Sequence, residues 1–104
     1  MKKIEFSDLV NKTILIGLTY YTANNEFVEQ KQFWGTVLES NENHILVRLN
    51  DGEIFSLPPN LSSTEVAPPG EYRLRSTGEV IVDPDYLTTW NVNLPKNEAP
   101  YTNR

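Results

Sequence analysis

The sequence predicts an all-β domain, a small antiparallel β-barrel of six or seven strongly bent strands with a short N-terminal helical turn. Short segments of alternating apolar and polar residues recur along the chain, tight-turn sequences separate them, and helical periodicity is nearly absent. The 104 residues suit one domain. We expect residues 1–94 to form the barrel and residues 95–104, which contain two prolines and no apolar periodicity, to form a flexible C-terminal tail.

The first elements are a helical turn and a strand. Ser7 can cap a turn through residues 7–12, with Asp8 favourably placed in the first turn. Residues 13–22 alternate clearly and predict a strand. The residues that share its apolar face are Ile14, Ile16, Leu18 and Tyr20. Residues 23–26 then predict a turn, because asparagine tolerates left-handed backbone conformations.

Residues 27–40 are long for one strand, and both faces carry large apolar side chains. Phe33 and Trp34 are neighbours, so they point to opposite faces. Gly35 follows them, and a glycine inside a strand often marks a bulge or bend. We expect a bend there, with Phe33 in the core and Trp34 covered by the N-terminal turn or by the connection at 60–70. Without that cover, Trp34 is the best candidate for an exposed binding anchor.

The rest of the chain predicts five more strands, at residues 44–49, 53–57, 71–77, 80–82 and 87–94. Asn-Asp-Gly at 50–52 predicts a hairpin, because Asp-Gly satisfies the positive backbone angles of a tight primed turn. Two prolines at 58–59 end one strand, and a further Pro-Pro-Gly makes the connection at 60–70 irregular.

The composition limits where the protein can be located and which chemistry its side chains can perform. The chain has no cysteine, which excludes disulfides, thiolate metal ligands and cysteine nucleophiles. The N-terminal segment lacks the apolar core of a signal peptide, and no run approaches the length of a transmembrane helix. We therefore expect a cytoplasmic protein that does not associate with membranes.

Acidic residues outnumber basic ones by 14 to 9, for a net charge of −5. The excess lies between residues 23 and 65, a segment with seven acidic residues and only two basic ones, Lys31 and Arg48. An acidic surface repels phosphate backbones and steers a basic partner toward itself, so nucleic acid is not an expected partner. Mild acidity also aids solubility without any partner, and the sequence leaves that alternative open.

No residue pattern indicates catalysis or metal binding. His44 is the single histidine, so zinc would need carboxylate or water partners, and we expect this side chain half exposed at a strand start. Asp83 and Asp85 flank Pro84; such a pair can do acid/base chemistry or hold a cation, but the local sequence favours a turn. Phosphate-binding and nucleophile motifs are absent. We expect no catalytic residue, metal or cofactor.

Two other groups of side chains allow more than one interpretation. Arg73 and Arg75 share a strand face, where they can bind a phosphate or carboxylate or, as we favour, pair with glutamates of a neighbouring strand. Aromatic side chains can stack on bases, as in oligonucleotide-binding barrels, but no basic groove accompanies them. These aromatics are Tyr20, Tyr21, Trp34, Tyr86 and Trp90.

The segment FWGTVLESNENHILVRLNDGEIFSLPP, residues 33–59, resembles the central three strands of small Sm-like or Src-homology-type barrels. It shares with them a bent strand with an internal glycine, an apolar strand, an Asp-Gly hairpin and a short strand that ends in proline. The resemblance implies the fold alone, since no RNA-contact motif is matched.

The full layout, with PPGEYRLRSTGEVIVDPDY and TTWNV, is similar to small bacterial immunity proteins found beside secreted or contact-dependent toxins. That similarity implies an acidic, non-catalytic binding protein.

We therefore predict a non-catalytic, acidic protein-binding module, most concretely an immunity protein that neutralises a basic toxin domain. The expected interface combines acidic residues with an aromatic anchor. Its residues are Glu29, Trp34, Glu39, Glu42, Asp51 and Glu53. The alternatives are a barrel that binds nucleic acid or a small ligand through exposed aromatics, and an enzyme whose cleft gathers His44 with Asp83, Asp85 or a glutamate.

Overall fold

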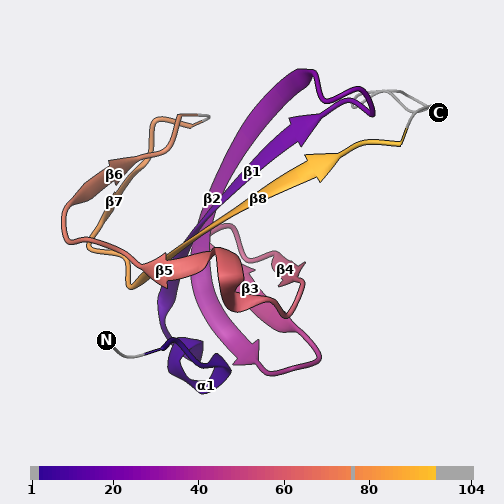
Figure 1. Cartoon of the computed structure of the whole chain (residues 1–104). Coiled ribbons are helices and arrows are strands. Elements are labelled where there is room, and N and C mark those ends of the chain that lie inside the picture. The colour runs from indigo at the N-terminus through magenta and orange to yellow at the C-terminus, as the bar shows by residue number, and fades with distance from the viewer. Residues whose placement is uncertain (1–2, 76, 96–104) are drawn as a thin grey trace.

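The computed structural model describes residues 3–75 and 77–95, which form one six-stranded sheet and a separate two-stranded hairpin (Figure 1). The order in the sheet is β4-β3-β2-β1-β8-β5. Its strands are β1 (Thr13–Tyr21), β2 (Phe27–Ser40), β3 (Ile45–Leu49), β4 (Ile54–Leu57), β5 (Thr64–Val66) and β8 (Tyr86–Asn93). The hairpin consists of β6 (Glu71–Arg73) and β7 (Val80–Val82), and the helical pieces are α1 (Phe6–Leu9) and the 3-10 turn η1 (Leu61–Ser63). The all-β class and the short N-terminal helical turn are confirmed.

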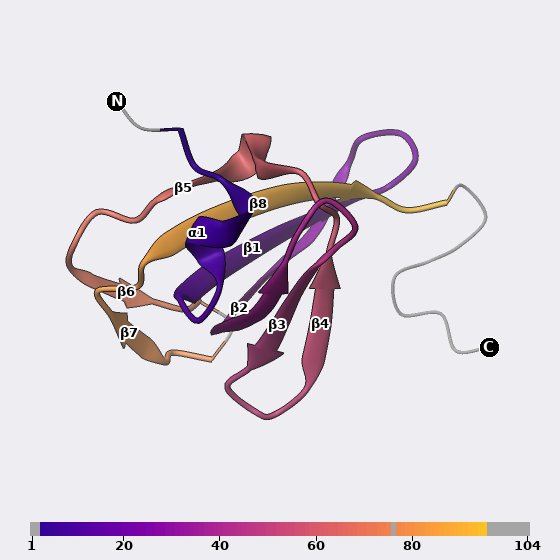
Figure 2. The same cartoon turned by 90° about the horizontal axis from the view of Figure 1, so that it is seen from below.

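The sheet is strongly curved but open. Figure 2 shows it curling from β8 through β1, β2 and β3 to β4. Strands β4 and β5 are its two edges, so the predicted barrel is not confirmed. The expectation of a purely antiparallel sheet is wrong, because β1 and β8 pair in parallel. A parallel pair needs a long crossover, and here β2 to β7 lie between the two strands in sequence.

Strand β2 is long because it has two partners in succession. Its first part pairs with β1 and its last part with β3. The register shifts between Val37 and Glu39, whereas Gly35 keeps regular pairs with Ile14 and Leu49. A bulge at Gly35 is therefore not found. The glycine is needed for close approach, since a Cβ there would lie 2.3 Å from the backbone oxygen of Arg48.

Two apolar clusters cover the two faces of the sheet. The main core holds the predicted face of β1 and extends through β2, β3 and β4 to the fully buried Leu9 of α1. Its buried residues are Leu9, Ile14, Ile16, Leu18, Val37, Ile45, Val47, Leu49 and Leu57. The second cluster lies under the β6–β7 hairpin and contains Leu15, Leu74 and Ile81. Successive residues of β1 thus serve opposite faces, as strand geometry requires.

Phe33 and Trp34 divide between these clusters. Phe33 packs against the main core, with its ring centroid 5.8 Å from that of Phe55. Trp34 packs in the second cluster, and its Nε1 donates a hydrogen bond to Glu79 Oε2 at 2.8 Å. Both rings are covered as expected, but the cover over Trp34 comes from the β6–β7 hairpin and not from the N-terminal turn or the 60–70 connection.

Several boundaries differ from the sequence predictions. The helix begins at Phe6 after Glu5, whose backbone N–H donates to Asp8 Oδ2, so Ser7 is not its cap. The connection at 60–70 contains η1 and β5, and the strand expected at 71–77 ends at Arg73. With the additional strand β5, the described residues form eight strands where six or seven were expected. Short segments of this kind carry too few residues to show a period.

The predicted turns form, although one has a different type. Asn25 adopts the left-handed conformation, with φ of 68°. In the β3–β4 hairpin Gly52 has φ of 94°, but Asp51 is not left-handed, so the turn is not a primed one. Instead, Gly52 N donates to Leu49 O and Leu49 N donates to Glu53 O, as in a three-residue loop with a glycine bulge.

Within the described residues no helix has the length and apolar character to cross a membrane. Residues 96–104 of the predicted tail lie outside the described residues.

Candidate functional site

A groove beside the β3–β4 turn gathers carboxylates from three distant parts of the chain. Glu29 comes from β2, Asp51 from the turn and Glu79 from the residue before β7. The groove has a volume of ≈ 440 Å³. Its other lining residues are Gln30, Lys31, Gln32, Phe33, Asn50, Leu74 and Thr77. We call it the acidic groove.

Hydrogen bonds from neutral donors hold Glu79 in the acidic groove. Trp34 Nε1 donates to Oε2 at 2.8 Å, and Asn50 Nδ2 lies 3.1 Å from both carboxylate oxygens. The Gln32 side chain accepts a further bond from the backbone N–H of Arg75 at 2.6 Å. Because Trp34 and Asn50 are uncharged, they orient the carboxylate of Glu79 without cancelling its charge.

The charge of the acidic groove is negative overall. Lys31, the single cation among its described lining residues, lies 3.8 Å from the carboxylate of Glu29 and 5.8 Å from the ring centroid of Tyr20. The Glu29 side chain is 24 % exposed. Asp51 is exposed and accepts the backbone N–H of Glu53, which is exposed beside it. A basic side chain that enters this groove therefore meets more negative than positive groups.

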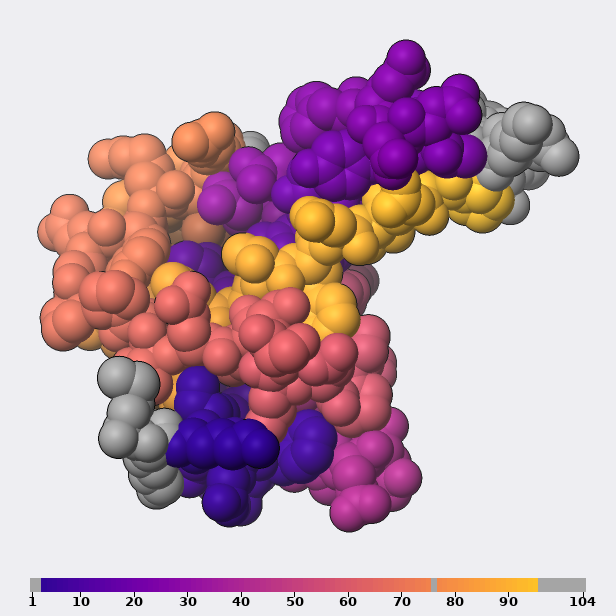
Figure 3. Space-filling view, viewed as in Figure 1, coloured from indigo at the N-terminus to yellow at the C-terminus, as the bar shows by residue number. Residues whose placement is uncertain are grey.

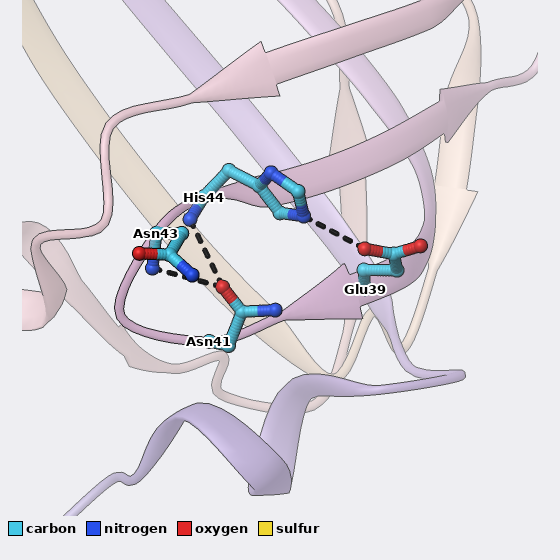
Figure 4. A network of polar contacts seen from close by, with 4 residues as sticks. All are labelled: Glu39, Asn41, Asn43 and His44. Atoms are coloured by element: carbon cyan, nitrogen blue, oxygen red, sulfur yellow. Dashed lines mark hydrogen bonds and ion pairs between the residues drawn. The ribbon is translucent and has the colours of Figure 1, made fainter.

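The remaining predicted acidic residues lie at the opposite end of β3. Glu39 Oε1, at the end of β2, and His44 Nε2 are 2.7 Å apart, and Asn41 Oδ1 accepts the backbone N–H groups of Asn43 and His44 in the β2–β3 turn (Figure 4). Glu42 is exposed in the same turn. At roughly 3.3 Å per residue, the five residues of β3 place this turn about 16 Å from the β3–β4 turn.

The six predicted site residues thus fall into two groups. Trp34 lies beside the acidic groove because its indole N–H donates to Glu79. Glu53 lies beside it because its backbone N–H donates to Asp51. Trp34 and Glu53 thus form the first group together with Glu29 and Asp51. Glu39 and Glu42 form a separate group at the β2–β3 turn.

The two aspartates that flank Pro84 hold backbone segments together. Asp83 Oδ1 accepts the N–H of Gly70 at 2.7 Å. Asp85 Oδ2 accepts the backbone N–H and the hydroxyl of Thr13 at 2.9 and 3.0 Å. Both carboxylates therefore link the bend that leads into β8 to segments that are distant in the sequence. Across residues 3–75 and 77–95, no three His, Cys, Asp or Glu side chains lie close enough to hold a metal ion.

The two arginines do not share a strand face. Arg73 lies in β6 and donates to the backbone oxygen of Gly78 at 3.2 Å, whereas Arg75 lies beyond the end of that strand. Among the described residues, neither forms an ion pair with a glutamate. The favoured cross-strand pairing is therefore not found.

The aromatic side chains do not form one platform. Trp34 packs in the second cluster, while Tyr20, Tyr86 and Trp90 pack against the main core. Tyr21 makes an edge contact with Phe27, at 6.4 Å between centroids. Trp34 therefore lies on the opposite face of the sheet from Tyr20, Tyr86 and Trp90.

Sequence reasoning missed Glu79 and Asn50. Glu79 is 45 residues from Trp34 along the chain, and the docking of the β6–β7 hairpin brings them together. The pairing of an indole N–H with a distant carboxylate leaves no local pattern in the sequence.

No protein-family model matches this chain, and neither a curated protein nor a solved structure was found that matches it.

Proposed function

We propose that this protein is a non-catalytic protein-binding module whose acidic groove receives a basic side chain of its partner. The observation that carries the proposal is the convergence of Glu29, Asp51 and Glu79 in one groove. Glu29 stands on the sheet, and Glu79 is held by Trp34 and Asn50. Binding groups that are fixed before the partner arrives lose little conformational freedom when it binds.

The charges of the groove act mainly on the rate of association. Partly exposed carboxylates are screened by water and salt, so each contributes little to affinity by itself. A cluster of one sign nevertheless attracts an oppositely charged surface during encounter. In this proposal Trp34 positions Glu79, and the guanidinium or ammonium group of the partner occupies the groove.

The most concrete form of the proposal is an immunity protein that acts in the cytoplasm and neutralises a basic toxin domain. The net charge of −5 and the acidic groove support it. Blocking a basic active site or nucleic-acid-binding surface needs complementary charge and no chemistry in the inhibitor.

The test measures association between the full chain and the polypeptide encoded by the gene beside its own in the genome. The groove variant carries Glu29→Lys and Asp51→Lys. The control variant carries Glu39→Lys and Glu42→Lys, which change the net charge equally at the far end of β3. We expect the groove variant to lose about tenfold or more in association rate at low salt, with a weaker salt dependence, while the control stays close to the unmodified protein.

Two results contradict the proposal. Equal losses for both variants would show that net charge acts without the groove. Absence of binding to the neighbouring polypeptide, combined with tight binding of a single-stranded oligonucleotide at low salt, would favour the nucleic-acid alternative.

A further inference from the structure

A second groove lies where the curved sheet stays open, between β4 and the C-terminal half of β8. It has a volume of ≈ 470 Å³ and a lining without charged residues. Figure 3 shows the recess below the projecting yellow end of β8. Its main apolar side chains are Leu18, Phe55, Leu57, Trp90 and Val92. We call it the seam groove.

Two strand edges border the seam groove. Strand β4 ends the sheet, so its outer edge has no strand partner among the described residues. Strand β5 pairs with β8 only from Tyr86 to Thr88, which leaves one edge of β8 uncovered by any described strand from Thr89 to Asn93. Unpaired backbone donors and acceptors therefore flank an apolar hollow.

The register identifies which groups of β4 point outward. Leu49 N donates to Glu53 O, and bonded and non-bonded pairs alternate along an antiparallel ladder. Phe55 is opposite Val47 at the next bonded pair. The backbone N–H and C=O groups of Ile54 and Ser56 consequently face away from β3.

Strand β4 carries no lysine and no proline within its four residues, and Pro58 and Pro59 follow it directly. Natural edge strands carry lysine, proline or a cover that prevents further pairing. The four residues of β4 are uncharged, and Ile54 is 54 % exposed. The opposite edge strand, β5, has a charged residue, Glu65, among its three. Strand β4 is therefore the edge better suited to accept another strand.

Trp90 adds an unused hydrogen-bond donor. Its Nε1 is buried and has no acceptor among the described residues. Buried donors are nearly always paired, because an unpaired one loses its bond to water without replacement. A chain that enters the seam groove carries carbonyl oxygens, which are acceptors of the kind that this nitrogen lacks.

We propose that the seam groove binds an extended, uncharged peptide segment of a partner protein, which adds to β4 as a further strand. Alternate side chains of the segment contact Leu18, Phe55 and Trp90. The uncharged lining selects an uncharged segment, since a charged group placed there would lose its hydration without meeting an opposite charge. Backbone pairing with a free edge supplies affinity, and the apolar hollow supplies specificity. This inference does not depend on the acidic groove.

The test titrates the full chain with a synthetic seven-residue peptide of alternating threonine and valine, acetylated and amidated at its ends. Nuclear magnetic resonance follows the amides of Ile54 and Ser56 and the two indole N–H signals. We expect the amides and the Trp90 indole to shift, while the Trp34 indole, bonded to Glu79 on the other face, stays fixed. Ser56→Pro removes one outward donor and weakens binding by about tenfold, whereas Ser56→Ala keeps the donor and the affinity.

A second peptide separates strand addition from simple apolar contact. N-methylation of alternate amides keeps the side chains but removes the donors, so we expect its binding to be lost. Equal binding of both peptides, or unchanged binding by Ser56→Pro with its fold intact, would overturn the proposal. So would a concentration-dependent dimer that Ser56→Pro abolishes, because the occupant would then be a second copy of this chain.

Discussion

At the scale of single residues, Gly35 controls how closely two strands can approach. It pairs regularly on both sides, with Ile14 of β1 and Leu49 of β3. The space beside its Cα is filled by the backbone of Arg48 and the side chain of Val47. The residue therefore keeps the β2–β3 ladder together above a tightly packed part of the main core, where small changes in volume are felt.

Replacing Gly35 by alanine tests this role. The new Cβ would lie 2.3 Å from the Arg48 oxygen and 2.8 Å from Val47 Cγ1, so the β3 backbone must move. We expect Gly35→Ala to lower the free energy of unfolding by about 1–3 kcal/mol in urea titrations. Gly17→Ala is the matched control in β1, because its Cβ meets only Thr89 Cγ2, at an ordinary 3.5 Å. Equal stability of the two variants would refute the close-approach explanation.

At the scale of elements, the β6–β7 hairpin depends on the sheet beneath it. Two short strands alone are marginally stable in water, so the hairpin needs the second cluster. Polar links add to this packing: Trp34 and Asn50 bond to Glu79, and Gln32 bonds to the backbone of Arg75. The links also form the wall of the acidic groove, so docking of the hairpin and assembly of the groove are one event.

The bond between Trp34 and Glu79 can be measured with a double-mutant cycle. Trp34→Phe removes the donor and keeps a ring in the second cluster, while Glu79→Ala removes the acceptor and leaves a partly buried indole N–H unpaired. We expect a coupling free energy of about 1–2 kcal/mol between the two changes in urea unfolding. Additive effects would mean that the hairpin docks without this bond.

The sequence predicted those features of the fold that depend on residues close together in the chain. The face of β1 with Ile14, Ile16 and Leu18 was predicted because alternation is local. The parallel pairing of β1 with β8 was not predicted, since the alternation of apolar and polar residues carries no information on strand direction. Charge counting placed Glu29 and Asp51 in the expected acidic interface, but it could not select Glu79, whose position depends on a hairpin that docks through Leu74 and Ile81.

At the scale of the whole molecule, β1 joins the two clusters. Leu15 faces the second cluster, while Ile14 and Ile16 face the main core. The main core spans five elements, and the second cluster rests on the hairpin and one face of the sheet. Weakening the second cluster should therefore release the hairpin first, whereas weakening the main core should unfold the whole chain.

Two truncations of buried leucines distinguish these outcomes. Leu74 is 2 % exposed in the second cluster, and Leu9 is 0 % exposed in the main core. In a Trp90→Phe background, Trp34 fluorescence reports hairpin docking and far-ultraviolet circular dichroism reports the sheet. We expect Leu74→Ala to move the fluorescence transition to lower urea than the dichroism transition, because local opening then precedes global unfolding. Leu9→Ala should instead shift both together, by about 2–5 kcal/mol in unfolding free energy. Coincident transitions for Leu74→Ala would show that the hairpin and the sheet unfold as a single cooperative unit.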